Sequence, residues 1–169
     1  MKKLTMMIAA LAMCVAMQAQ TKFHDVEANQ AKGAVKSISM TVMGMPRNTT
    51  FTEDGKMQQD GLTDAKYDEN GYIQSAKMSV QGQEAEVKFT WENGQMVKQT
   101  VSAMGQDIAT SFVFDEKGLV KTVKMNMMGQ DVEIPVTDYK FDDKGNWTSR
   151  KMSMMGQEME EARTITYYE

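Results

Sequence analysis

The sequence has one cysteine and one histidine in 169 residues, and this scarcity limits its chemistry. The cysteine, Cys14, lies within MKKLTMMIAALAMCVAMQAQ. That stretch has the pattern of a secretory signal peptide: basic residues, a short apolar run, then small and polar residues. Cleavage near residues 19–20 would leave a mature chain without cysteine. Such a chain has no disulfide, thiol nucleophile or cysteine metal site.

Long apolar runs are also missing after residue 20, so we expect no transmembrane segment once the signal is removed. Residues 1–20 are expected to be a signal-peptide helix, and the chain to be exported to the periplasm or the cell exterior. The alternative is a lipoprotein anchored at Cys14. A lipoprotein signal usually has a small residue just before the cysteine, and here that residue is Met13.

Basic residues are also fewer than acidic residues, 19 against 23. The formal net charge is −4, and removal of Lys2 and Lys3 with the signal takes it to −6. Nucleic-acid binding depends on basic patches, so an acidic exported chain is not expected to bind nucleic acid. The remaining residues suit a single domain that can bury a core without disulfides.

Catalytic motifs are absent from the sequence. It contains no HExxH, P-loop, GxGxxG or cysteine cluster. His24 is followed by Asp25, and such a pair can do acid–base chemistry. The pair lies in an N-terminal segment, residues 21–32, that could be mobile. We therefore expect a protein that is not an enzyme, has no catalytic residues and takes no cofactor.

Glycine, in contrast, is placed in a regular pattern. Ten of the glycines form five pairs with the same spacing. In most pairs the first glycine ends an acidic turn, as in FDEKG at 114–118 and FDDKG at 141–145, and the second glycine precedes glutamine. A fixed spacing repeated five times indicates one structural unit used five times. The pairs, each eleven residues apart, are Gly33 and Gly44, Gly71 and Gly82, Gly94 and Gly105, Gly118 and Gly129, and Gly145 and Gly156.

Side chains between the paired glycines alternate between polar and apolar. After Gly118, for example, Thr122 and Lys124 are polar, whereas Met125 and Met127 are apolar. A period of two indicates a strand with one face in water and one in a core. Each unit is therefore predicted to be a β-hairpin. The second glycine forms its tip, and the acidic turn connects it to the next hairpin.

Residues 33–169 are accordingly predicted to form one all-β domain, an antiparallel meander of roughly ten to twelve strands. A sheet with one apolar face must cover that face. It can do so as a barrel, as an open curled sheet or as two packed layers. We favour a curled sheet or barrel, because a single meander with short turns closes easily.

One position in each unit breaks the alternation. Two residues after the first glycine, an apolar residue is out of phase with the later apolar positions. An extra residue in one strand reverses the facing of side chains, so we expect a β-bulge and irregular pairing after each turn. The five residues are Val35, Ile73, Met96, Val120 and Trp147.

Methionine is abundant, and two groups can be distinguished by position. The first group occupies apolar strand positions that valine or alanine fill in other units, so these residues are expected in the core or along a ligand cavity: Met40, Met78, Met125, Met127, Met152 and Met154. The second group lies beside tip glycines, where thioethers could bind Cu(I) or be oxidised. Its members are Met104, Met128 and Met155.

The aromatic-Asp-x-x-Gly turns, such as YDENG at 67–71, resemble the YD repeats of RHS-type proteins. FDDKGNWTSR at 141–150 and the RTITYY ending also resemble small, uncharacterised exported repeat proteins of Bacteroidetes. The resemblance covers residues 33–169 and implies export and a β-hairpin repeat fold. The repeats are too few for the shell that long RHS arrays build around a toxin domain.

These patterns predict an exported, non-enzymatic β-repeat protein with a binding or envelope-structural role. Its Met-lined interior could hold a small lipophilic ligand. Another envelope protein is the alternative partner. The alternative function is that of a periplasmic Cu(I)-binding or oxidant-buffering protein that uses exposed methionines at hairpin tips.

Overall fold

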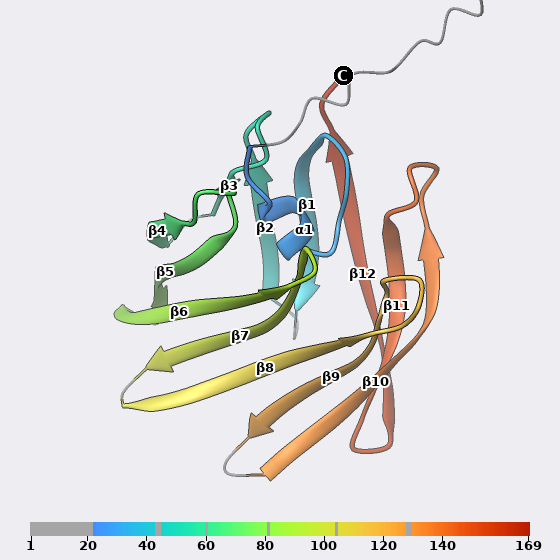
Figure 1. The fold of residues 1–169 in the computed structure, drawn as a ribbon. Coiled ribbons are helices and arrows are strands. Elements are labelled where there is room, and N and C mark those ends of the chain that lie inside the picture. Colours follow the sequence, from blue (N-terminus) through green and yellow to red (C-terminus); the bar gives the residue numbers. More distant parts are fainter. Residues whose placement is uncertain (1–21, 43–44, 60, 81, 104, 128–129) are drawn as a thin grey trace, which may run out of the picture.

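The computed structural model describes residues 22–42, 45–59, 61–80, 82–103, 105–127 and 130–169. These residues form one short helix, α1 (Asp25–Ala28), and twelve strands (Figure 1). The strands are β1 (Val35–Val42), β2 (Met45–Phe51), β3 (Met57–Gln58), β4 (Leu62–Tyr67), β5 (Ile73–Val80), β6 (Gln83–Glu92), β7 (Gln95–Ala103), β8 (Gln106–Phe114), β9 (Val120–Met127), β10 (Gln130–Phe141), β11 (Trp147–Met154) and β12 (Gln157–Tyr167). The predicted signal-peptide helix lies outside the described residues.

All twelve strands belong to one antiparallel sheet, which confirms the predicted meander. Each strand from β4 to β12 pairs with the next, and β12 then pairs with β1, which pairs with β2 and β2 with β3. The sheet is strongly curled and nearly closes into a barrel, as Figure 1 shows. Its two edges are β3 and β4, which follow each other in sequence.

The predicted irregularity after each acidic turn is confirmed in all five units. In the β8–β9 pair, Phe114 lies opposite Val120, but Val113 lies opposite Thr122, so Lys121 is the extra residue. Equivalent shifts occur at the start of β1, β5, β7 and β11. Each bulge turns its apolar residue into the core, where all five are buried: Val35, Ile73, Met96, Val120 and Trp147.

The acidic turns are held by their aspartates. Asp142 Oδ1 accepts hydrogen bonds from the amides of Lys144 and Asn146 at 3.0 and 2.8 Å. Gly145 closes the turn with φ +76, a left-handed conformation that favours glycine. Asp68 and Asp115 accept the equivalent pairs of bonds. The backbone of the turn therefore accounts for these carboxylates.

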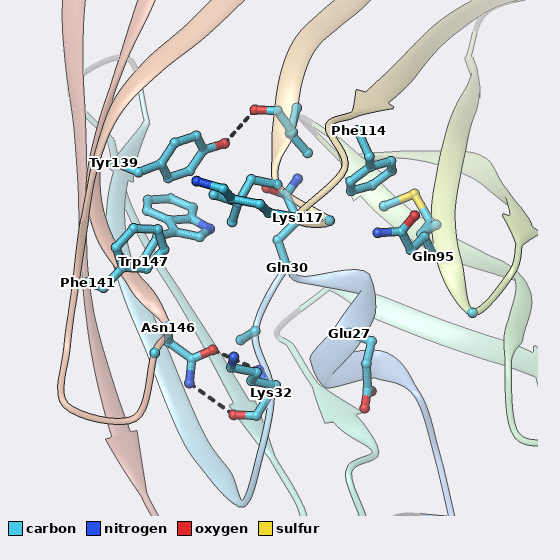
Figure 2. Close-up of a pocket in the computed structure, with 17 residues that line it drawn as sticks. Glu27, Gln30, Lys32, Gln95, Phe114, Lys117, Tyr139, Phe141, Asn146 and Trp147 are labelled. Atoms are coloured by element: carbon cyan, nitrogen blue, oxygen red, sulfur yellow. Dashed lines mark hydrogen bonds between the residues drawn. The ribbon is translucent and has the colours of Figure 1, made fainter.

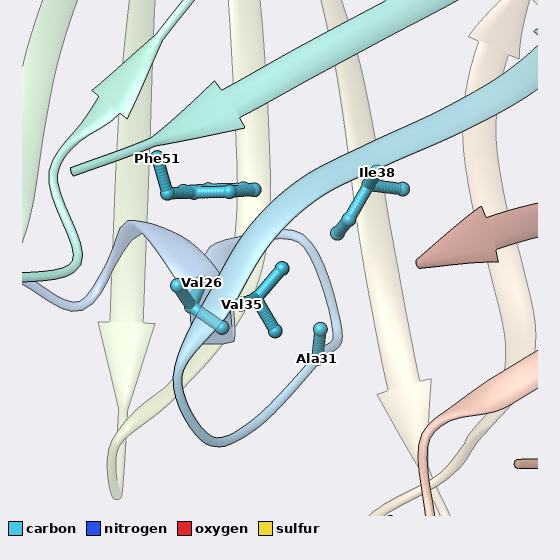
Figure 3. Packing of buried hydrophobic residues seen from close by; sticks show 5 residues of the cluster. All are labelled: Val26, Ala31, Val35, Ile38 and Phe51. Atoms are coloured by element: carbon cyan, nitrogen blue, oxygen red, sulfur yellow. The ribbon is translucent and has the colours of Figure 1, made fainter. Parts of the chain in front are cut away.

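Two apolar clusters form the core. Figure 3 shows the first, in which α1 and the segment after it pack against β1 and β2; its buried residues are Val26, Ala31, Val35, Ile38 and Phe51. The second lies on the inner face of β9 and β10 and contains Val120, Val123, Ile134 and Val136. The short helix is therefore part of the core.

The segment from 22 to 32, which could be mobile by sequence, is bonded to both edges of the sheet. Asp25 is fully buried, and its Oδ2 accepts hydrogen bonds from the Met57 amide of β3 at 2.7 Å and the Tyr67 hydroxyl of β4 at 2.6 Å. The Phe23 amide donates to the Asp54 carbonyl, and the His24 amide to the Gly71 carbonyl. One carboxylate thus bridges the gap between β3 and β4.

Asp25 gives a pH dependence that can be tested. Burial raises the pKa of Asp25 above its ordinary value of 3.8, although the bonds from Tyr67 and Met57 act in the opposite direction. Above pH 3.8 the folded protein therefore binds more protons than the unfolded chain. Its free energy of unfolding should then fall as the pH rises through this interval. Asp25→Asn should flatten that fall, as urea unfolding of both proteins from acidic to neutral pH would show. Equal slopes would contradict the assignment.

A second pair of bulges has no counterpart in the glycine pattern. In β4 and β10 the register shifts again, and Asp64 and Asp138 adopt positive φ of 52 and 53. Asp64 pairs with Lys77 and Asp138 with Lys151, both at 3.1 Å. The two sites share the sequence Thr-Asp-x-Lys-aromatic, at 63–67 and 137–141. This motif marks two equivalent strands, β4 and β10.

No helix among the described residues is long and apolar enough to cross a membrane.

Candidate functional site

The curled sheet encloses a cavity of about 280 Å³. Its apolar lining includes Met40 of β1, Met78 of β5, Phe89 of β6 and Phe112 of β8. Residues 28–30, at the end of α1, close one side. The inward positions of the predicted strands thus converge on one space, as a barrel requires.

The structure separates the predicted ligand-binding methionines. Met40 and Met78 line the cavity. Met125, Met152 and Met154 are partly buried and pack against the second apolar cluster. Met127 lies in β9, where only its backbone is described. Two of the six methionines therefore belong to this site and three to the core beside it.

The predicted metal-binding methionines are not brought together among the described residues. Met155 is 84% exposed at the tip between β11 and β12. Met104 and Met128 lie outside the described part of the chain. In the described ranges, no group of three or more His, Cys, Asp or Glu side chains could hold a metal ion. Cu(I) binding by the tip methionines stays a prediction.

The side chains of His24 and Asp25 are directed to different partners. The His24 ring stacks on Tyr72 with centroids 4.0 Å apart, and its Nδ1 lies 3.7 Å from Glu27 Oε2. The Asp25 carboxylate is directed to Met57 and Tyr67 instead. Each member of the pair thus has a contact that accounts for its position.

Arginines, which the sequence analysis did not single out, also line the cavity, and two of them flank Met40, because Arg163 of β12 and Arg47 of β2 pair with it in register. Arg47, Arg150 and Arg163 line the cavity, and the only carboxylate among its lining residues is Glu161. Arg150 and Arg163 are buried. The alternation along β11 and β12 marks these positions as inward. Their polar character made them look like solvent-facing residues in a repeat.

The charge of Arg150 is partly neutralised by the carboxylate of Glu161. Its Nε donates to Glu161 Oε2 at 2.6 Å and its Nη1 to Gln30 Oε1 at 2.7 Å. Nη1 also lies 3.3 Å from the Tyr139 hydroxyl. Within the described residues, Nη2 of this guanidinium makes no hydrogen bond. It is therefore a free donor beside the cavity.

Arg163 is bound by carbonyls rather than by a carboxylate. It donates from Nε to Trp147 O at 2.8 Å and from its two terminal nitrogens to Asn29 O and Gln30 O, both at 2.7 Å. Burial, with a smaller contribution from the nearby Arg150 charge, lowers the pKa of Arg163 to about 9. It remains a cation at neutral pH, and carbonyl dipoles offset only part of its buried charge.

Both guanidinium groups also contact the Trp147 ring, at 4.2 Å from Arg150 and 3.6 Å from Arg163 to the ring centroid. Cation–π contact of this kind is stronger where the cation is desolvated. The indole therefore fixes these two arginines in the lining of the cavity. A fixed donor fork suits recognition of a carboxylate or phosphate oxygen.

The cavity has an adjoining open groove. Met40, Arg47, Gln59 and Arg163 line both spaces, and the groove continues over outward residues of β1, β2 and β12. A small molecule in the groove would meet Arg47, which is exposed, before the buried arginines. The site thus combines access from solvent with a lining of apolar side chains and arginines.

No protein-family model matches this chain, and a search of curated proteins finds no matching relative. Membership of the YD-repeat family stays a prediction. The geometry of the cavity therefore carries the functional argument.

Proposed function

We propose that this chain is an exported, non-enzymatic binding protein that holds a small lipophilic ligand with an anionic group in its interior. The observation that carries the proposal is that apolar side chains and buried arginines line the same cavity. Met40, Met78 and Phe89 face a space that Arg150 and Arg163 also line. Apolar pockets with a few placed polar groups are the usual form of small-molecule sites.

Charge supports an anionic ligand. The chain as a whole has a formal charge of −4, but the cavity lining has three arginines and one glutamate. A cationic recess with low-dielectric walls focuses the electrostatic field, and this attracts anions even though the protein as a whole is acidic. An anion would also compensate the buried charge of Arg163, which has no carboxylate bonded to it among the described residues.

Size restricts the ligand. A volume of about 280 Å³ lies near the lower end of ligand pockets. The cavity therefore suits a medium-chain fatty acid or a small aromatic acid. Methionine side chains adapt to irregular apolar shapes, so the apolar lining tolerates different tails.

Calorimetric titration with two matched ligands would test the proposal. Octanoate and octanol share a tail and differ in the charged head, so octanoate should bind clearly more tightly. Arg47→Gln removes the exposed cation of the site and should weaken octanoate binding about tenfold. The same change should leave octanol binding unaltered.

Native mass spectrometry of the exported protein would show whether it retains a ligand, and a repeat with Cu(I) would test the alternative. Failure of both octanoate and octanol to bind would contradict the proposal. Stoichiometric Cu(I) uptake that Met155→Leu reduces would instead favour the methionine-tip function.

A further inference from the structure

A second pocket, of about 230 Å³, lies at the end of the barrel where the acidic turns meet the segment after α1 (Figure 2). It shares Gln30, Met96 and Trp147 with the interior cavity. Its other lining residues come largely from the turns that precede β7, β9 and β11. Most of its lining is therefore distinct from that of the interior cavity, and the proposed interior ligand does not depend on it.

The most informative group in this pocket is the indole of Trp147. The residue is only 4% exposed, and its Nε1–H has no hydrogen-bond partner among the described residues. Figure 2 shows that nitrogen on the side of the ring that faces the other pocket residues. A buried donor without a partner is costly and rare. The pocket therefore presents a donor ready for an acceptor oxygen.

The other tryptophan shows the contrast. Trp91 Nε1 donates to the Ile73 carbonyl at 2.8 Å. Trp91 lies at the end of β6, before its turn, whereas Trp147 begins β11, after its turn; among the described residues only Trp91 has its donor satisfied. The free donor is therefore specific to the pocket.

An aromatic rim lies beside this donor. Phe141 is 47% exposed, and its ring stacks on that of Tyr139 at 5.9 Å with an interplanar angle of 18°. Tyr139 is held in place because its hydroxyl donates to Val120 O at 2.7 Å. Figure 2 shows both rings on the same wall as Trp147, with Phe114 on the far side. The pocket thus offers a fixed aromatic face to solvent.

Amide and ammonium groups complete the lining. The Gln95 side chain reaches over Gly118 and makes no hydrogen bond within the described residues, so its amide can both donate and accept. Lys32 and Lys117 are exposed at the rim. Asn146 is fully used: it accepts from Lys32 N at 2.8 Å and donates to Lys32 O and the Tyr167 hydroxyl. Asn146 therefore shapes the pocket, and Gln95 is free to bind.

From this arrangement we infer that the turn-end pocket binds a neutral sugar ring. Trp147 Nε1 donates to a hydroxyl or acetamido oxygen, Gln95 bonds a neighbouring hydroxyl, and the exposed face of Phe141 packs against the apolar C–H face of the ring. Sugars combine such faces with many acceptors, and amphipathic aromatic sites match both. The charged residues that line the described pocket are Lys32, Lys117 and Glu27, and none of them is buried, which favours a neutral ligand over an anion.

Nuclear magnetic resonance of the two indole N–H groups tests this directly. The ¹⁵N-labelled protein would be titrated separately with glucose, galactose, mannose and N-acetylglucosamine. At least one sugar should move the Trp147 indole signal in a saturable way, with a dissociation constant on the order of 1 mM. The Trp91 signal should stay fixed, because its donor is already bonded.

Two variants make the test specific. Phe141→Ser changes an exposed ring and should weaken sugar binding about tenfold while the Trp91 signal shows an intact fold. Trp147→Phe removes the donor and should abolish binding. Octanoate should bind Phe141→Ser as it binds the wild type, since that site does not use Phe141. The inference is overturned if no sugar moves the Trp147 signal, if both indole signals move together, or if Phe141→Ser leaves the affinity unchanged.

Discussion

Gly71→Ala is expected to destabilise the protein by about 3 to 5 kcal/mol, the range of substitutions with a specific structural cause. Gly71 has φ +87, and a Cβ there would overlap the Lys22 carbonyl. That carbonyl belongs to backbone and cannot rotate away. The N-terminal segment would have to move, and the bond from the His24 amide to Gly71 O would be lost. Urea unfolding followed by tryptophan fluorescence measures the loss.

Gly118→Ala is the matched control, because Gly118 ends the same kind of turn with φ +77. Its nearest neighbour would be Gln95 Nε2 at 3.2 Å, the end of a flexible side chain. Alanine there should cost only the conformational strain, about 1 to 2 kcal/mol. Gly71→Ala should also make Lys32 a site of rapid trypsin cleavage. Equal losses of stability in the two variants would show that the close approach of residue 22 is unimportant.

Arg163→Met is expected to lower the free energy of unfolding by roughly 2 to 4 kcal/mol. Methionine preserves much of the apolar stem but leaves the carbonyls of Trp147, Asn29 and Gln30 without their donor. Arg163→Lys should recover only part of the loss, because an ammonium cannot reproduce a planar fork. Thermal and urea unfolding would rank wild type above lysine and lysine above methionine.

Arg47→Met provides the comparison, since Arg47 is exposed on β2 at the same cavity. We expect a stability change of no more than about 0.5 kcal/mol, as for other surface substitutions. A loss from Arg163→Met no larger than that from Arg47→Met would refute the view that Arg163 ties α1 to β11 and β12.

The local features of the fold could be predicted from the sequence because they depend on short-range chemistry. Paired glycines and turn aspartates define the hairpins, and side-chain alternation defines the faces. Even the bulges that follow Val120 and Trp147 are indicated by a break in that alternation. Each inference needs only the residues within one unit, and the unit is repeated five times.

Features that depend on distant contacts could not be predicted in this way. The pattern around Asp25 gives no sign that this carboxylate joins β3 to β4. Alternation places Arg150 on the inward face, but it gives no sign of the bond to Gln30, which is 120 residues away in sequence. The second pair of bulges is an exception, because a local signal exists for it. The motif Thr-Asp-x-Lys-aromatic occurs at 63–67 and 137–141, and its aspartate tolerates positive φ.

The methionine prediction shows the same division. Alternation correctly indicated that Met40 and Met78 point inward, and it indicated the same for Met152 and Met154. Whether an inward residue meets a cavity or a packed core depends on the curvature of the sheet and on where α1 lies. One repeat unit contains no information about either.

The pairing of β1 with β12 sets an order on folding. β1 is among the first strands to be synthesised and β12 is the last, and their pairing joins Val35 to Tyr167. Strands β4 to β12 can assemble hairpin by hairpin as they appear, whereas β1 and α1 must wait for the end of the chain. Contacts of such wide separation form slowly, and until then β1 exposes an unpaired edge. A chain of this topology would depend on protection of β1 until β12 has been synthesised.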